Sequence, residues 1–152
     1  MASADITTKD TLVKGVNSEN NYIRSEAHIL DGVENPGILA ADTHSLFKIP
    51  KGNALVGLKV ISLATATSGG SATVQFKTKV GTASAEAING SAIALAKLAA
   101  GEVHNFNAAA IVTYSATADT TIQMTVGTAA LTAVKLLVIA EYIPVDMFMT
   151  AG

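Results

Sequence analysis

Two segments of this sequence alternate between apolar and polar residues with a period of two, and this pattern constrains the fold more than any other feature. The segments are residues 72–80 and 120–126. One side of the alternation is apolar in both segments: Val74, Phe76 and Val80 in the first, and Ile122, Met124 and Val126 in the second. The other side carries only Thr, Gln and Lys. Successive side chains of a β-strand point to opposite faces of a sheet, so each segment predicts a strand with one buried and one exposed face.

Further strand-like segments follow at regular spacing, separated by turn signals rich in Gly, Ser and Asn. Residues 54–65 and 134–143 are apolar on both sides of the alternation, which is typical of strands with both faces covered. Shorter apolar segments lie at residues 46–50, 103–106 and 110–114. Together the segments predict an all-β protein, a β-sandwich or jelly roll of about seven or eight strands.

Residues 81–101 fit no single pattern. Asn89-Gly90 is a tight-turn signal between them. Residues 93–100 suit either a short helix or a further strand, because short apolar runs do not distinguish the two.

Residues 1–43 carry a broken, polar pattern that differs from the rest of the chain. Loop signals at Asn17–Asn21 and Asp31–Gly37 flank residues 22–30, whose alternation suits one exposed strand. We therefore expect residues 1–43 to form an extended N-terminal arm with one strand, and residues 44–152 to form the β-sandwich domain. A disordered tail fits the same pattern equally well.

The chain is poor in charged residues. They make up 14% of its 152 residues, against roughly 25% in average globular proteins. A main body with so few charges predicts that part of its surface is hidden in an interface, and hence a homo-oligomer. The alternative is a β surface built from short Ala and Thr side chains. A net charge of −2 without a cluster of Lys or Arg argues against nucleic acid as a partner.

Signals for secretion or membrane insertion are missing from the sequence. The first ten residues contain neither a basic region nor an apolar run, so we expect a protein that is made and used inside a cell. The most apolar stretch, Leu136–Ala140, is too short to span a bilayer, and we expect no membrane partner. The chain has no cysteine, which excludes disulfides and thiolate metal sites.

Motifs for catalysis or metal binding are also missing. His28, His44 and His104 are scattered, and none has metal-ligand spacing. Alternation would place Asp42 and His44 on one face of a strand, as a weak metal site or a pH-sensitive pair would require. We expect a solvated loop end instead. The sequence contains no nucleophile elbow, no phosphate-binding loop and no paired carboxylates. We expect no enzymatic activity, no cofactor and no metal.

From Asp42 onward the sequence resembles small virion proteins of tailed bacteriophages, described as head decoration, capsid cement or minor structural proteins. The segments that carry the resemblance are Leu46-Phe47-Lys48-Ile49-Pro50-Lys51-Gly52, Ala72-Thr73-Val74, Val80-Gly81-Thr82, Ala87-Ile88-Asn89-Gly90-Ser91-Ala92, Thr117-Ala118-Asp119-Thr120-Thr121-Ile122 and Val138-Ile139-Ala140-Glu141-Tyr142-Ile143. The resemblance implies a β-sandwich or jelly-roll protein, commonly a homotrimer, on the exterior of the capsid. It would be made in the host cytoplasm and bridge neighbouring subunits of the major capsid protein, in part through a terminal arm.

The apolar residues of the N-terminal segment are the candidate capsid contacts, because that segment has no core of its own. They are Leu12, Val13, Val16, Tyr22 and Ile23. Folding of these side chains back onto the sandwich is the alternative. Two other functions remain open: another virion part, such as a head fibre base, neck or tail protein, or a ligand-binding β-sandwich module. The absence of Trp counts against the ligand-binding module, because sugar sites use aromatic platforms.

Overall fold

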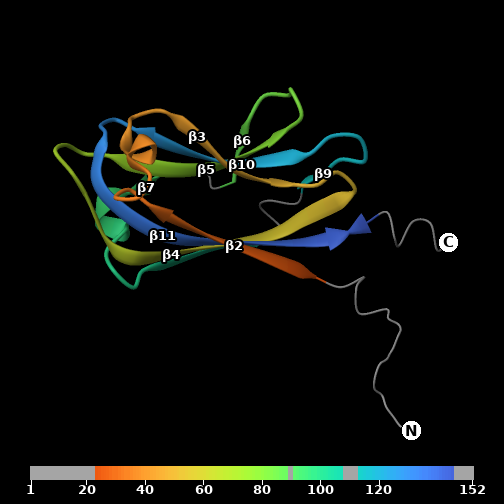
Figure 1. Ribbon diagram of the computed structural model, residues 1–152, viewed down its shortest axis with the longest axis horizontal. Coiled ribbons are helices and arrows are strands. Elements are labelled where there is room, and N and C mark those ends of the chain that lie inside the picture. The colour runs from red at the N-terminus through yellow and green to blue at the C-terminus, as the bar shows by residue number, and fades with distance from the viewer. Residues whose placement is uncertain (1–22, 89–90, 108–112, 146–152) are drawn as a thin grey trace, which may run out of the picture.

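The computed structural model describes residues 23–88, 91–107 and 113–145, and it consists of two antiparallel sheets packed face to face (Figure 1). The first sheet, here sheet I, has the order β2-β11-β4-β8, and β9 also pairs with β4. Its strands are β2 (Arg24–Asp31), β11 (Leu131–Pro144), β4 (Asn53–Ser68), β8 (Val103–Asn107) and β9 (Thr113–Tyr114).

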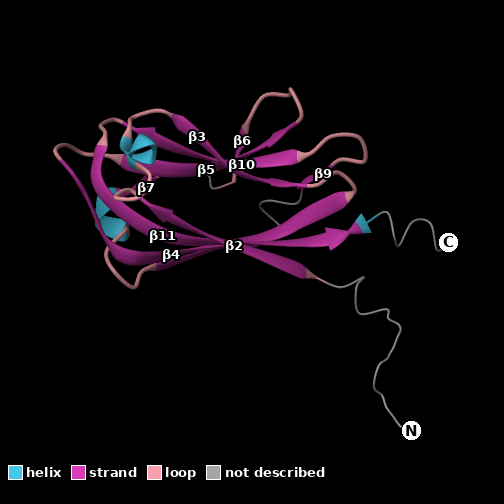
Figure 2. Ribbon diagram, in the orientation of Figure 1, coloured by secondary structure: helices cyan, strands magenta, loops and turns pink. Residues whose placement is uncertain are grey.

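The second sheet, sheet II, has the order β3-β10-β5-β6, and β7 also pairs with β5. Its strands are β3 (Thr43–Ile49), β10 (Thr120–Gly127), β5 (Thr73–Val80), β6 (Glu86–Ala87) and β7 (Ile93–Ala94). Two short 3-10 helices, η3 (Pro36–Leu39) and η4 (Leu95–Lys97), lie at one end of the sandwich (Figure 2). The predicted all-β sandwich is therefore confirmed.

The strand order is that of a jelly roll. Most connections lead from one sheet to the other, as from β2 to β3, β3 to β4, β4 to β5, β9 to β10 and β10 to β11. The short strands β6 and β7 share one position beside β5, and β8 and β9 share one beside β4. Each sheet therefore has four strand positions, as in a jelly roll of two Greek keys.

The core lies between the sheets and follows the predicted alternation. Val74 and Phe76 of β5 and Ile122 and Met124 of β10 are fully buried. They pack against the inner residues of sheet I, among them Val60. The alternation predicted these faces correctly because one side of each strand faces the opposite sheet and the other faces outward.

The two strands with apolar residues on both sides behave differently. The inner residues of β4 and β11, such as Leu58 and Val138, are buried in the core. Their outer residues Ile61, Leu137 and Ile139 are only half-buried. Within the described part of the chain no element covers this outer face, although the sequence pattern predicted strands covered on both sides.

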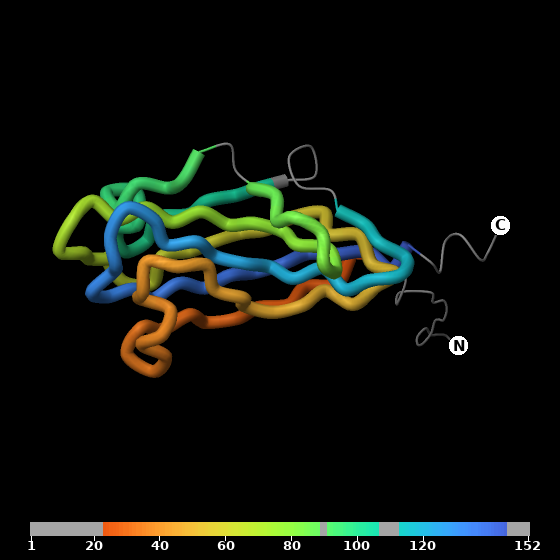
Figure 3. The backbone as a smooth tube through the Cα atoms, turned by 90° about the horizontal axis from the view of Figure 1, so that it is seen from above, coloured from red at the N-terminus to blue at the C-terminus, as the bar shows by residue number. Residues whose placement is uncertain are grey.

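The predicted exposed strand near residues 22–30 is β2, and it belongs to the sandwich. It pairs with β11 along its whole length, and Ile38 of the following η3 is buried in the core. The folded body thus starts at β2, earlier than the boundary that we expected after Thr43. β2 and β3 lie along the same edge of the sandwich, and the connection between them projects beyond that edge at one corner (Figure 3).

Residues 93–100, which suited either a short helix or a further strand, contain a short element of each kind: the two-residue strand β7 is followed directly by the 3-10 helix η4. The described part of residues 81–101 contains β6, β7 and η4, and Leu98 after η4 is fully buried. Its carbonyl oxygen accepts hydrogen bonds from the buried Ser62 hydroxyl at 2.9 Å and from the backbone N–H of Ala66 at 3.0 Å. These contacts join the segment to β4.

Candidate functional site

A row of four apolar side chains crosses the outer face of sheet I. The strand register places Leu137 of β11 opposite both Ile29 of β2 and Ile61 of β4, and Ile61 opposite Val103 of β8. Directly opposite residues in an antiparallel sheet share a face, so these four side chains, which we call the apolar row, form one line across four strands. Ile29 is 62% exposed and Val103 is 48% exposed.

Further apolar residues widen the apolar row along the strands. Ala27 and Ile139 lie opposite each other in the next row, and Leu63 of β4, which is 42% exposed, lies on the other side. Two lysines and two carboxylates surround these residues, so the formal charge of the face is balanced: Asp31, Lys59, Lys135 and Glu141.

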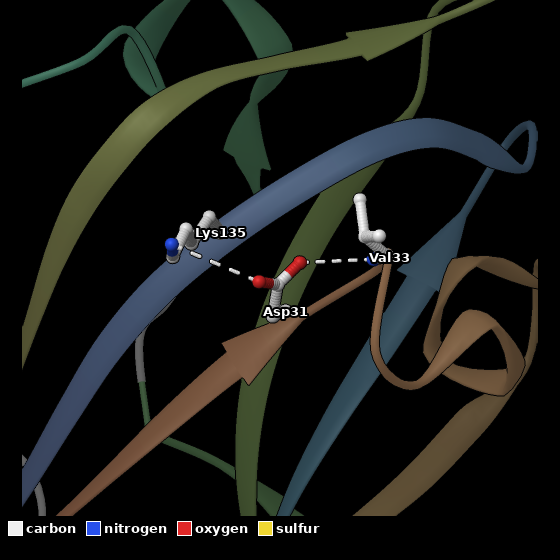
Figure 4. A network of polar contacts seen from close by, with 3 residues as sticks. All are labelled: Asp31, Val33 and Lys135. Carbon is white, nitrogen blue, oxygen red and sulfur yellow. Dashed lines mark hydrogen bonds and ion pairs between the residues drawn. The ribbon is translucent and has the colours of Figure 1, made fainter.

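Asp31 neutralises one of these lysines and also shapes the turn after β2 (Figure 4). Its Oδ2 lies 3.7 Å from Nζ of Lys135, and its Oδ1 accepts a hydrogen bond of 2.9 Å from the backbone N–H of Val33. The backbone N–H of Gly32 donates to the carbonyl oxygen of Val134 at 2.9 Å. These bonds fix the conformation of the turn. Val33 lies in this turn with 86% of its surface exposed to solvent.

The outer face of sheet II is polar and provides an internal comparison. The register places Gln123 of β10 opposite Ser45 of β3 and Lys77 of β5, and Thr125 opposite Thr43 and Gln75. The hydroxyls of Thr43 and Thr125 are hydrogen-bonded at 2.8 Å. A sheet face with hydroxyls, amides and lysines is stable in water, whereas the face of sheet I leaves apolar area exposed. The two outer faces of the sandwich therefore differ: that of sheet II is polar and that of sheet I is apolar.

The predicted contact residues lie mostly outside the described part of the chain. Leu12, Val13, Val16 and Tyr22 all fall within residues 1–22. Ile23 is described, directly precedes β2 and is 59% exposed. The sequence interpretation did not name the apolar row, although a signal for it existed: both sides of residues 54–65 and 134–143 are apolar.

Each of the three histidines contacts a nearby group of the same chain. Nε2 of His44 is 2.9 Å from the carbonyl oxygen of Ala40, and Nε2 of His104 is 2.8 Å from that of Lys97. The His28 ring stacks on Phe47 with 4.2 Å between the ring centres. The carboxylate of Asp42 accepts the backbone N–H of Thr43 at 2.7 Å. Within the described ranges, no three His, Asp or Glu side chains gather as a metal site would require.

Two hollows on the described part of the surface are lined mainly by small side chains. One of about 520 Å³ lies between the β4–β5 turn and η4, with Ala66, Ala72 and Ala94 among its walls. Another of about 390 Å³ lies beside β5 and includes Thr78, Glu86 and Tyr114. Small-molecule sites usually combine apolar walls with several convergent polar groups. The exposed apolar face of sheet I is therefore a more distinctive feature of this surface than either hollow.

No protein-family model matches the chain, and no curated protein matches it either. In the part that the structure describes, no helix has the length and apolar character needed to cross a membrane.

Proposed function

We propose that the chain is a non-enzymatic structural protein of a tailed-bacteriophage virion. It binds the exterior of the assembled capsid as a homo-oligomer and stabilises the shell by bridging subunits of the major capsid protein. The observation that carries the proposal is the apolar row, exposed on one face of a charge-poor jelly roll. The sequence resemblance supplies the virion context, and jelly rolls occur among capsid proteins as well as in other classes.

The mechanism is burial of this apolar face against the shell. Full burial of an aliphatic side chain contributes about 1.5–3 kcal/mol. Ile29, Val103 and Leu63 are each about half exposed, so together they would add roughly 2–5 kcal/mol on contact. Association costs about 4–15 kcal/mol in lost freedom, so one copy would bind weakly. Several linked copies raise the effective concentration at the second and third contacts, which converts weak contacts into lasting attachment.

The test is attachment to capsids that lack the native protein. Val103→Ser and Leu63→Ser reduce the exposed apolar area on β8 and β4. Both residues are exposed, so the substitutions leave the packing of the core unchanged. We expect each variant to fold normally and to reach lower occupancy on the shell, measured by electron microscopy of the particles. Val33→Ser is the matched control, since Val33 is still more exposed but lies in a turn outside the sheet.

Two outcomes would count against the proposal. If the wild-type chain does not bind any capsid, the proposed attachment to the shell is wrong. If it binds and both sheet variants bind equally well, the contact lies elsewhere, for instance in residues 1–22. Head fibre base, neck or tail protein remains the second candidate, and labelling of intact virions with antibodies against the chain distinguishes head from tail.

A further inference from the structure

β2 is a regular edge strand of sheet I. Its eight residues pair with β11 from Arg24 opposite Tyr142 to Asp31 opposite Lys135, without a bulge. The hydrogen bond from Gly32 N–H to Val134 continues this ladder and fixes its parity. In an antiparallel ladder every second residue bonds to the same neighbour, so the even-numbered residues of β2 bond to β11. The odd-numbered residues direct their backbone N–H and C=O groups toward the open edge.

Three residues on this open edge have no backbone partner within the described part of the chain: Ser25, Ala27 and Ile29. Asp31 is different, because its carbonyl oxygen accepts the N–H of Asn35 at 2.8 Å. Native edge strands are usually protected by lysine, proline or a bulge. β2 has none of these, whereas the corresponding edge strand of sheet II, β3, contains Lys48 and pairs with a register shift.

The inner side of β2 carries an unusual pair of polar residues. Glu26 and His28 point toward the space between the sheets, and Nε2 of His28 is buried without a hydrogen bond among the described residues. Oε2 of Glu26 is 3.4 Å from it. Inward polar groups at an edge oppose pairing with an arbitrary apolar strand, because the incoming strand would bury them unsatisfied. They permit pairing only with a strand that presents complementary groups.

We propose that β2 pairs with β2 of a second copy of this chain, antiparallel and about a two-fold axis at Ala27. Residues that lie opposite each other must have their side chains on the same face of the joined sheet. Two registers meet this condition with the two-fold axis near the middle of β2. With Ala27 opposite Ala27, Glu26 of each copy lies opposite His28 of the other. With His28 opposite His28, like groups meet and Glu26 faces Leu30. The first register places Glu26 opposite His28 twice, and only the exposed Arg24 lies opposite Leu30. The second register gives neither Glu26 a partner and brings the two histidines together, so the first is favoured.

In this register the backbone groups also match. Ala27 pairs with Ala27, and Ser25 pairs with Ile29 twice, so three hydrogen-bonded pairs contribute about six backbone hydrogen bonds. The two copies of sheet I become one continuous sheet with both apolar outer faces on the same side. The contact joins copies in twos, which departs from the trimer implied by the sequence resemblance. It does not depend on capsid binding.

Disulfide formation tests the register directly, because the chain has no cysteine of its own. In a hydrogen-bonded pair the Cα atoms are about 5.5 Å apart, within the range that a disulfide spans. We expect Ala27→Cys to form a disulfide-linked dimer rapidly under mild oxidation. Ser25→Cys is the matched control, since the two Ser25 residues would lie about 13 Å or more apart along the strands. We expect it to cross-link at least tenfold more slowly.

Removal of the edge hydrogen bond tests the pairing itself. Ala27→Pro deletes an N–H that faces the open edge and leaves the ladder to β11 intact. We expect the wild-type chain to have the mass of two 15.5 kDa copies in light scattering, and Ala27→Pro to have the mass of one with a similar melting temperature. If Ala27→Pro does not fold, the cysteine pair still decides. Equal cross-linking of the two cysteine variants, or a wild-type monomer or trimer, would overturn the proposal.

Discussion

Replacement of Ile122 by alanine tests the assignment of the core. Ile122 is fully buried on the inner side of β10. Its strand lies between β3 and β5, with Phe47 opposite on one side and Thr78 on the other. Both neighbouring strands hold the backbone in place, so the surroundings cannot easily collapse into the space that the shorter side chain leaves.

The expected loss follows from this geometry. Ile→Ala substitutions in protein cores cost about 2–5 kcal/mol, and the cost rises with the volume of the residual cavity. A central strand that cannot shift favours the middle of this range, so we expect the free energy of unfolding to fall by about 3–4 kcal/mol. For a chain of this size each kcal/mol lowers the melting temperature by about 2–4 °C, which predicts a decrease of roughly 6–16 °C.

The assay is urea unfolding and thermal melting, each followed by circular dichroism. Gln123→Ala is the matched control, because Gln123 is the next residue and lies on the outer face of the same strand. We expect a change of less than about 1 kcal/mol for it, as is usual for surface positions. Ile122→Asp would bury an unpaired carboxylate and should prevent folding. Equal stability of Ile122→Ala and Gln123→Ala would refute the assignment of the inner face.

Three other perturbations have defined outcomes. Gly52 has a φ of 85°, so Gly52→Ala should lower the free energy of unfolding by about 1–2 kcal/mol, as measured by urea titration. Gly69→Ala is the control, because no atom lies within 4 Å of the added Cβ. It should change the free energy of unfolding by less than about 0.5 kcal/mol in the same titration. Asp31→Ala should cost about 1 kcal/mol through the lost turn hydrogen bond. Lys135→Ala should cost less, because the Lys135 side chain is 46% exposed and solvent screens its 3.7 Å ion pair; equal losses would mean that the ion pair matters more than the turn. Deletion of residues 2–21 leaves every described strand in place, so we expect the melting temperature to stay within about 5 °C and occupancy on capsids to fall; loss of folding would show that the deleted segment is part of the sandwich.

The parts of the fold that the sequence predicted depend on local alternation. β5 and β10 have one polar and one apolar side, so their buried faces could be read directly from residues such as Phe76 and Gln123. β6 and β7 have two residues each and are too short to show any period. The jelly-roll order depends on pairing between strands distant in sequence, and no local pattern encodes it.

The surface was harder to predict than the core. The apolar outer side of β4 and β11 reads as a covered strand, and the sequence cannot say whether this chain or a partner covers it. β2 was expected in an arm because residues 1–43 are polar and broken by loop signals. Glu26 and His28 also occupy the inner side of β2, where a core-facing strand normally has apolar residues. Its role as an edge strand of the sandwich became apparent only from its pairing with β11.

The position of β11 affects how the protein can be synthesised. It is the last described strand to leave the ribosome, yet it lies between β2 and β4 in sheet I. Until it is translated, β4 lacks its neighbour on that side and β2 has no strand to join, so sheet I cannot close. Pairing between strands so far apart in sequence is intrinsically slow and leaves strand edges exposed to aggregation. A nascent chain stalled before Leu131 would therefore keep its longest apolar strand unpaired on that edge, and we expect efficient production to require either rapid completion of translation or a chaperone that shields β4 until β11 arrives.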